Sequence, residues 1–282
     1  MVPVKICGRR CRLDGLRQAS QGSPGTSSES QLMSTVTKLL QSLLLLTVCA
    51  FPASEVIGDD TVPFQSLFNG EDLSGWDGDP RFWTVRDGTI VGETTKDNAA
   101  EKNTFLICRG GEFSDFELKF EYQVTGYNSG VQYRSQELGK WSVGGYQADF
   151  EARWHPSDNG PVDKFSGMFF DEQGRMFLGQ RGDAVIVRSN EADPKKPIIE
   201  KVATVGDPAE LESQIRRDDW NEYRIIANGF QFTHIINDRV MAVGFDEDRQ
   251  NRKASGILAF QLHSGPPMQI KLRRIRIREL QD

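Results

Sequence analysis

The feature that most constrains the fold of this chain is a series of short runs in which apolar and polar residues alternate, separated by Gly, Asn, Asp and Pro. The clearest run is 116–124, where aromatic or aliphatic residues take every second position and Glu, Lys and Gln take the others. Successive side chains of a strand point to opposite faces, so this run predicts a half-buried strand of an antiparallel sheet. Residues 83–91 predict a hairpin, because Asp87 and Gly88 readily adopt the positive φ angles of a tight turn.

Similar runs recur along the chain, and no long segment with a helical period of 3.6 residues interrupts them. The further runs are 130–135, 146–151, 184–188, 222–227, 230–236, 257–263 and 269–279. Residues 208–216 form either one short helix or an irregular loop. Many strands with little helix predict an all-β sandwich or jelly roll of two antiparallel sheets. Because no repeat or linker divides the pattern, residues 54–282 are expected to form a single domain.

The N-terminal residues 1–53 do not share this pattern. Lys38 leads into an apolar run over 39–53 that is too short to cross a membrane and has the order of a signal peptide. We therefore expect residues 1–53 to be removed, which leaves a mature protein without a transmembrane span, exported to the periplasm or the extracellular space. Met33 is an alternative start of the chain. No pattern in the chain predicts an oligomeric state.

Charge and cysteine content narrow the possible partners. The full chain of 282 residues has a formal net charge of −6, and the expected signal segment holds six basic but only two acidic residues, so the remainder is more acidic. An acidic surface repels phosphate backbones, which excludes nucleic acid as the expected partner. Cys108 is the one cysteine beyond residue 53, so it cannot form an internal disulfide or a thiolate metal site. We expect it to be a small buried residue.

Three of the predicted strands carry a polar face of an unusual kind. Its members are amides, acids, a guanidinium and an imidazole flanked by Gly and Ser, unlike the Lys and Glu of 116–124. They are Gln132 and Arg134 on the first strand, Gln147, Asp149 and Glu151 on the second, and Gln261 and His263 on the third. Such alternation most often indicates a sheet face exposed to solvent. Planar hydrogen-bonding groups beside short residues instead favour a cleft that binds sugar hydroxyls.

Four titratable residues on or beside this face are the candidate catalytic groups. Asp149 and Glu151 lie two residues apart on one strand, so their Cα atoms are about 6.5–7 Å apart, which falls in the range of about 5–9.5 Å for glycosidase carboxyl pairs. Mutual repulsion would raise one pKa and leave the other low, which separates an acid from a base. His155 and His263 adjoin the same face. The four could instead ligate a divalent metal ion, since carboxylates and imidazoles suit such ions, although their spacing matches no diagnostic metal motif.

Aromatic residues in Gly-rich surroundings are candidate platforms for sugar rings, and Trp141 and Trp154 fit this description better than the other tryptophans. Burial in the core is the alternative for both. The candidate substrate-binding residues are Gln132, Arg134, Tyr146, Gln147, Trp154, Gln261 and Ser264.

Five stretches in the same order add a family resemblance. They are LFNGEDLSGW at 67–76, NSGVQYRS at 128–135, GYQADF at 145–150, WNEYR at 220–224 and QLHSGPP at 261–267. Together they resemble the bacterial 3-keto-disaccharide hydrolase family, also described as 3-keto-glucoside 1,2-lyase / 3-keto-2-hydroxy-glucal hydratase. The resemblance covers roughly 64–280. It implies a concanavalin A-like jelly roll with a concave sugar-binding face, and an oligosaccharide or glycoside as substrate.

The resemblance also implies a reaction. A ketone at C3 acidifies the hydrogen at C2, so a base can remove that proton, the enolate can expel the aglycone from C1, and water then adds to the enone. Such a site needs a base, an acid and donors at the C3 oxygen. On this hypothesis Asp149 or Glu151 is the base, His155 or His263 is the acid, and Arg134, with Gln132 and in one version a metal ion, stabilises the enolate.

Two other functions use the same residues. A carbohydrate-binding jelly roll without catalysis would use them for recognition. A direct glycoside hydrolase would use Asp149 and Glu151 as an ordinary carboxyl pair on an unoxidised sugar.

Overall fold

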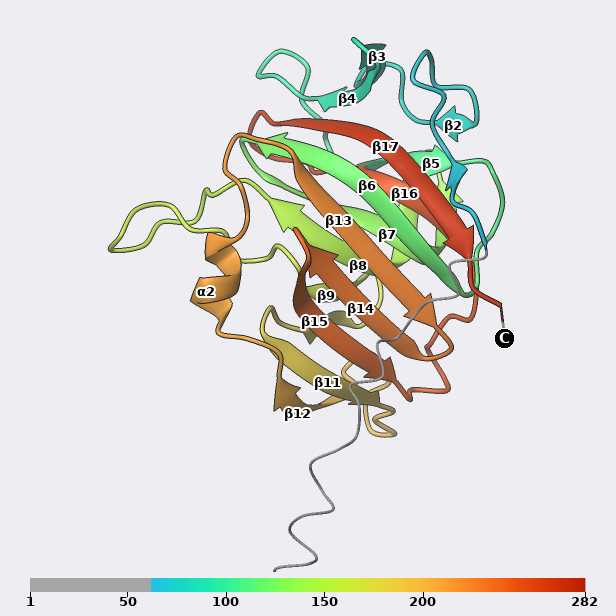
Figure 1. The fold of residues 1–282 in the computed structure, drawn as a ribbon, viewed down its shortest axis with the longest axis vertical. Coiled ribbons are helices and arrows are strands. Elements are labelled where there is room, and N and C mark those ends of the chain that lie inside the picture. Colours follow the sequence, from blue (N-terminus) through green and yellow to red (C-terminus); the bar gives the residue numbers. More distant parts are fainter. Residues whose placement is uncertain (1–61, 282) are drawn as a thin grey trace, which may run out of the picture. The chain divides into compact units, whose positions relative to one another are not determined.

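Two β-sheets pack face to face in the computed structural model, which describes residues 62–281. The predicted signal peptide lies outside the described residues. In Figure 1 the strands of the ten-stranded sheet lie in front of those of the seven-stranded sheet. The chain is a concanavalin A-like jelly roll, which confirms the predicted all-β class. Among the described strand pairs only β11 with β15 is parallel.

The strands have between two and twelve residues, and their order in each sheet differs from their order in the sequence. The ten-stranded sheet runs β12-β11-β15-β14-β13-β6-β17-β4-β3, with β1 paired to β17. Its members are β1 (Gln65–Ser66), β3 (Trp83–Arg86), β4 (Thr89–Glu93), β6 (Phe116–Thr125), β11 (Asp183–Arg188), β12 (Ile198–Thr204), β13 (Asn221–Asn228), β14 (Gln231–Ile236), β15 (Arg239–Asp246) and β17 (Gln269–Glu279). The seven-stranded sheet runs β10-β9-β8-β7-β16-β5-β2. Its members are β2 (Trp76–Asp77), β5 (Thr104–Cys108), β7 (Asn128–Gly139), β8 (Ser142–Glu151), β9 (Phe169–Glu172), β10 (Met176–Gly179) and β16 (Ile257–Leu262).

Aromatic side chains fill the space between the sheets. Phe120 on β6 contacts Phe150 on β8 and Phe260 on β16, with ring centroids 6.0 and 5.1 Å apart. These residues occupy the apolar positions of the alternating runs, so burying them fixes which face of each strand is turned outward. Cys108 is buried and unpaired, as expected.

Local signals in the sequence agree with the turns and the helix. The predicted hairpin is formed by β3 and β4, and its turn residues Asp87 and Gly88 have φ angles of 50° and 69°. Residues 208–216 contain the helix α2 (Pro208–Ser213), capped by the Asp207 side chain, which accepts hydrogen bonds from the next turn. Within 62–281, no helix combines the length and the apolar character needed to cross a membrane.

One half of the outer face of the seven-stranded sheet is apolar and covered. The hairpin between β7 and β8 folds over it, so that the Trp141 backbone carbonyl accepts a hydrogen bond from Phe105 on β5 (2.9 Å). Trp141 packs on an apolar cluster and donates its indole N–H to Asp77 (2.8 Å). The cluster consists of Phe105, Ile107, Val143 and Ala259. Trp141 is therefore part of this cover, and its predicted role as a sugar platform is wrong.

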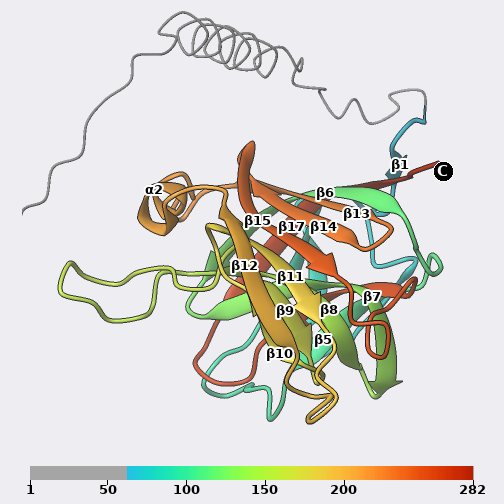
Figure 2. The same ribbon diagram turned by 90° about the horizontal axis from the view of Figure 1, so that it is seen from below.

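The other half of that face lies beneath the long segment that joins β8 to β9. This segment projects from the sheets as a yellow-green loop in Figures 1 and 2. It carries Trp154, His155 and Phe165, and it begins directly after Glu151, the last residue of β8.

Candidate functional site

A cavity of about 140 Å³ lies on this second, polar half of the seven-stranded sheet. Four strands supply its polar lining: Asn128 from β7, Gln147 and Asp149 from β8, Glu172 from β9 and Gln261 from β16. The remaining lining residues are mostly aromatic: Tyr127, Trp154, Phe165, Phe170, Phe177 and His263. The structure thus brings together five of the sequence-predicted residues, namely Gln147, Asp149, Trp154, Gln261 and His263.

A chain of side-chain hydrogen bonds fixes the position of the Asp149 carboxyl group. Ser135 donates to Gln132 (2.8 Å), Gln132 donates to Gln147 (2.5 Å), and Gln147 donates to Asp149 Oδ1 (2.6 Å). Gly130 makes room for this chain, because a Cβ atom at that position would lie 2.6 Å from Gln147 Cγ. Gln132 therefore acts behind Gln147 and does not line the cavity.

The environment of Asp149 favours its protonated form. Burial raises the pKa of this carboxyl group well above its ordinary value. The hydrogen bond from Gln147 opposes the rise, while the neighbouring carboxyl groups of Glu151 and Glu172 add to it. Since Oδ1 accepts from Gln147, a proton on Asp149 belongs on Oδ2, where the group can act as an acid.

Glu172 is a second carboxyl group in the cavity, and the sequence analysis did not find it. Burial raises its pKa, against the effects of Asn103, Gln173 and the nearby His263. Its oxygens lie 3.4 Å from the amide nitrogens of Asn103 and Gln261. The cavity therefore holds two carboxyl groups that are both shifted toward their neutral forms.

His263 presents one of its ring nitrogens as an acceptor. Its Nδ1 lies 2.5 Å from the backbone carbonyl oxygen of Ser264, which can only accept, so Nδ1 carries the proton in the neutral ring. Nε2 then holds a lone pair and can act as a base. The Tyr127 ring lies edge to face with the imidazole at 4.9 Å and fixes its orientation. Ser264 itself binds Asn103 through its N–H (3.0 Å) and supports His263 from outside the cavity lining.

Two buried polar atoms in the cavity lining have no hydrogen-bond partner in the described structure. They are Gln261 Oε1, in a residue 1% exposed, and Asn128 Nδ2, in a residue 7% exposed. Leaving such groups unsatisfied costs about 1–3 kcal/mol each. One free acceptor and one free donor on the same cavity are suited to the hydroxyl and carbonyl groups of a sugar.

Glu151 and His155 form a pair of their own, outside the residues that line this cavity. Glu151 accepts hydrogen bonds from Trp154 Nε1 (2.9 Å) and from the backbone N–H groups of Lys164 and Phe165. His155 Nε2 lies 3.4 Å from the same carboxylate, and its ring packs on Trp154 and Phe165. Burial raises the pKa of Glu151 to about 7, and Asp163 adds to this rise. Burial lowers the pKa of His155, as does Lys164.

These contacts give Glu151 an anchoring role. It holds both ends of the loop that supplies the aromatic walls Trp154 and Phe165. The prediction that Glu151 and His155 join Asp149 and His263 in one set of reactive groups is therefore corrected, because both side chains are engaged behind the wall.

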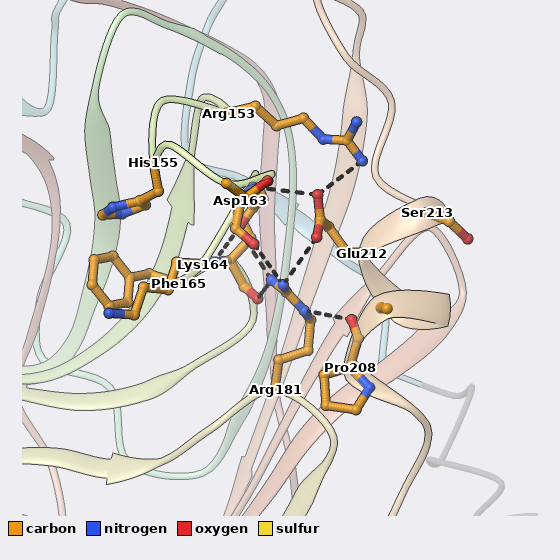
Figure 3. A network of polar contacts seen from close by, with 12 residues as sticks. Arg153, His155, Asp163, Lys164, Phe165, Arg181, Pro208, Glu212 and Ser213 are labelled. Carbon is orange, nitrogen blue, oxygen red and sulfur yellow. Dashed lines mark hydrogen bonds and ion pairs between the residues drawn. The ribbon is translucent and has the colours of Figure 1, made fainter. Parts of the chain in front are cut away.

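An ion-pair network fixes the other side of this loop to α2 (Figure 3). Arg181 donates to Asp163 Oδ1 (3.0 Å) and to the carbonyl oxygen of Pro208 (3.1 Å). Arg153 pairs with Glu212 on α2 at 2.8 Å. The loop is thus tied to β8 through Glu151 and to the helix through two arginines.

Arg134 does not lie on the polar face, which contradicts the prediction. A bulge interrupts the pairing of β7 with β8 after Tyr133, and Arg134 itself has φ 45°. This left-handed conformation breaks the period of two and turns the side chain toward Asp115 (2.5 Å) and the carbonyl oxygen of Gly229 (2.7 Å). Arg134 therefore cannot stabilise an enolate at the cavity.

Tyr146 is a core residue and not a substrate-binding one. Its side chain alternates with Gln147 and points between the sheets, where its ring lies 4.7 Å from that of Phe232. Its hydroxyl donates to Asp246 (2.6 Å).

Among residues 62–281, no group of three or more His, Cys, Asp or Glu side chains has a geometry that could hold a metal ion.

The cavity residues that the sequence analysis missed had weak signals. Asn128 precedes Gln132 by four residues, so the period of two would have placed it on the same face. Glu172 and Phe170 alternate with Phe169 and Asp171, but β9 and β10 have four residues each, too few to reveal a period. Phe165 and Phe177 belong to a segment without regular alternation.

Comparisons with known proteins find one family match that covers most of the described residues. The family described as 3-keto-alpha-glucoside-1,2-lyase-like domain matches residues 63–278. A search of curated proteins finds no match to the chain.

Three solved structures illustrate the range of similar folds. A Parabacteroides distasonis protein provisionally named a glycosyl hydrolase is 16% identical, with a TM-score of 0.48 over 77% of this chain and 94% of that one. The carbohydrate-binding module CBM66 of Bacillus subtilis is 15% identical, with a TM-score of 0.45 over 77% and 100%. A Bacillus subtilis protein of unknown function with a galectin-like fold is 8% identical, with a TM-score of 0.48 over 74% and 92%. Likeness at this level carries no information on activity.

Proposed function

Because the chain belongs to the family of 3-keto-alpha-glucoside-1,2-lyase-like domains, we propose that it cleaves 3-keto-glycosides by removing the C2 proton, eliminating the C1 aglycone and hydrating the product. The observation that carries this proposal is a pair of side chains on one cavity. His263 offers an acceptor nitrogen and Asp149 offers a carboxyl group with a raised pKa. Elimination from a ketone needs one such base and one such acid.

His263 is the base in this mechanism. Its Nε2 takes the C2 proton, while the Ser264 carbonyl oxygen holds Nδ1–H and stabilises the imidazolium that results. The electron pair of the C2–H bond moves into the enolate. Asn128 Nδ2, the buried donor without a partner, is available to the C3 oxygen on which that charge develops.

Asp149 is the acid. Its proton passes to the glycosidic oxygen as the C1–O bond breaks, so the aglycone leaves as a neutral alcohol and Asp149 becomes a carboxylate. In the second half of the reaction this carboxylate takes a proton from water, whose oxygen adds to C1. The His263 imidazolium returns a proton to C2, and both groups regain their starting forms. These roles reverse the sequence-based hypothesis, which gave the base to a carboxylate and the acid to a histidine.

The carboxyl groups of the cavity disfavour direct glycoside hydrolysis. That reaction needs one ionised and one protonated carboxyl group. Burial raises the pKa of both Asp149 and Glu172, so neither environment favours the ionised form that a nucleophile or base would need. Glu151, the predicted partner of Asp149, has its two oxygens occupied by the loop.

The test uses two disaccharides that differ only at C3 of the reacting sugar, one with a ketone and one with a hydroxyl. The proposal expects release of the aglycone sugar from the oxidised compound alone. Cleavage of both compounds would indicate a direct glycosidase. Binding of a disaccharide without release from either would indicate a carbohydrate-binding module. Asp149→Asn, with Asp183→Asn as a matched control away from the cavity, checks that the activity belongs to this protein.

We further propose that the mature protein is exported, on the basis of Lys38 and the apolar run 39–53. Cell fractionation followed by N-terminal sequencing tests this. A mature chain that starts near residue 54 outside the cytoplasm is expected, and a cytoplasmic chain that retains residues 39–53 would contradict it.

A further inference from the structure

A second cavity, of about 270 Å³, adjoins the one that holds Asp149 and His263. It is lined by Lys164, Phe165, Met168, Phe177, Gln180, Arg181 and Pro208. Phe165 and Phe177 line both cavities, so this aromatic pair forms the wall that the two share. A ligand seated at Asp149 and His263 that extends past the wall enters the second cavity.

The shared wall presents a broad apolar surface. The rings of Phe165 and Phe177 are nearly parallel, with centroids 6.0 Å apart and an interplanar angle of 30°. Phe177 is 51% exposed, so its ring is accessible to a ligand from solvent. Phe165 is held in place by its backbone N–H, which donates to Glu151 (2.8 Å).

The second cavity offers few groups that could bind hydroxyls. The Arg181 guanidinium lies at its edge, but it is committed to Asp163, the Ser166 carbonyl and the Pro208 carbonyl at 2.7–3.1 Å. Figure 3 shows Phe165 and Lys164 on one side of this arginine and Pro208 on the other. Of the polar lining residues only the exposed Lys164 and Gln180 remain available. A second sugar ring would find few protein partners for its hydroxyl groups here, so the protein gains little by binding one.

We propose that the second cavity is the aglycone subsite and that it selects flat, apolar aglycones, aromatic ones above all, over sugars. This inference rests on the proposed function, since it assumes that the oxidised sugar occupies the first cavity. The aglycone lies against Phe165 and Phe177, with Met168 and Pro208 completing the apolar surroundings. The ammonium group of Lys164, 5.2 Å from the Phe165 ring centroid, lies at the rim.

The test compares three 3-keto-glucosides of the same anomeric configuration, with benzyl, methyl and glucosyl aglycones. Benzyl alcohol and methanol are leaving groups of similar acidity, so their ratio of kcat/KM reports binding of the aglycone and not its departure. We expect the benzyl compound to exceed the methyl compound by about tenfold or more and to exceed the glucosyl compound as well. Phe177→Ala should reduce the benzyl-to-methyl ratio to about threefold or less.

Phe230→Ala is the matched control, because Phe230 is also 51% exposed and lies away from both cavities. It should leave the ratio unchanged. A benzyl-to-methyl ratio near one in the wild type, or a preference for the glucosyl aglycone, would overturn the subsite. If none of the three oxidised compounds is cleaved, the proposed function itself fails, which is a different result from equal cleavage of all three.

Discussion

The outer face of the seven-stranded sheet has two halves built from the same strands, and they differ in what covers them. Toward β5, the hairpin between β7 and β8 closes over Phe105, Ile107, Val143 and Ala259. Toward β9, Gln147, Asp149, Glu172 and Gln261 line a cavity. β8 and β16 contribute to both halves, so the strand period alone does not separate them.

Burial therefore serves a different purpose in each half. In the covered half, burial of apolar side chains stabilises the folded state. The polar half pays for the burial of carboxyl and amide groups, and two of its atoms have no partner among the described residues. Substitutions in the first should therefore change stability without changing chemistry, whereas substitutions in the second should do the opposite.

The largest expected effect is on catalysis in the polar half. Asp149→Asn and His263→Gln should each lower kcat for a 3-keto-glycoside by about 10²–10⁴-fold, since each removes a proton-transfer group. Neither should lower the unfolding midpoint in urea by much, because Asn has the shape of the protonated acid and His263 is half-exposed. If both variants retain near-normal turnover, the reactive groups lie elsewhere.

Phe105→Ala should show the reverse pattern in the covered half. Phe105 is 1% exposed beneath the hairpin, and Phe-to-Ala changes in a core cost about 3–5 kcal/mol. We expect the free energy of unfolding measured in urea to fall by this amount, with kcat per folded molecule unchanged. A large loss of kcat at full folding would mean that the two halves are coupled.

The titration of Glu151, which lies at the edge of the polar half, should change the free energy of unfolding by about 1–3 kcal/mol. Its pKa is about 7 in the folded chain, against an ordinary value of 4.5. The folded state therefore holds this proton more tightly, so its contribution to stability is complete below pH 4.5 and is lost as the pH rises through about 7. Glu151→Gln cannot lose a proton and should flatten the fall in unfolding free energy between about pH 5 and 8.

Asp149 contributes to the pH dependence with the same sign, because its pKa is also raised, so some slope should remain in the Glu151→Gln variant. Glu112→Gln, at an exposed position, serves as the control and should keep the wild-type slope. An identical slope in all three proteins would contradict the buried, protonatable state of Glu151.

The smallest expected effect concerns His155. Because it lies behind Trp154 and is absent from the cavity lining among the described residues, His155→Gln should change kcat by about threefold or less, far below the loss expected for His263→Gln. A loss of kcat as large as that of His263→Gln would place His155 among the reacting groups and would mean that the polar half extends beyond the cavity lining.

The sequence predicted the fold, and it predicted that residues of β8 and β16 lie together on one face, because both depend on the period of two. The regular alternation over 146–151 and 257–263 places Gln147, Asp149 and Gln261 on one face of their strands. The period failed at Arg134, where one residue with positive φ inverts the strand. It also gave no information on Glu172 or Phe177, whose strands are too short to show a pattern.

The sequence pattern could not predict the roles of residues that are positioned by long-range contacts. Glu151 faces the predicted side of β8, yet a loop that returns from residues 164 and 165 occupies its oxygens. Trp141 and Trp154 have the same predicted role as sugar platforms, but one closes the covered half and the other lines the cavity. Only the folded arrangement distinguishes them.

The most direct test of the account follows deuterium at C2 of a 3-keto-glycoside during cleavage in ordinary water. Elimination through His263 predicts that cleavage is slower than for the protium compound. It also predicts that solvent hydrogen appears at C2 whenever the His263 imidazolium exchanges with water before it returns a proton, and that this loss of deuterium exceeds the exchange seen without enzyme. Product that retains its deuterium, formed at the same rate from both compounds, would contradict proton removal at C2 and with it the mechanism proposed for the polar half.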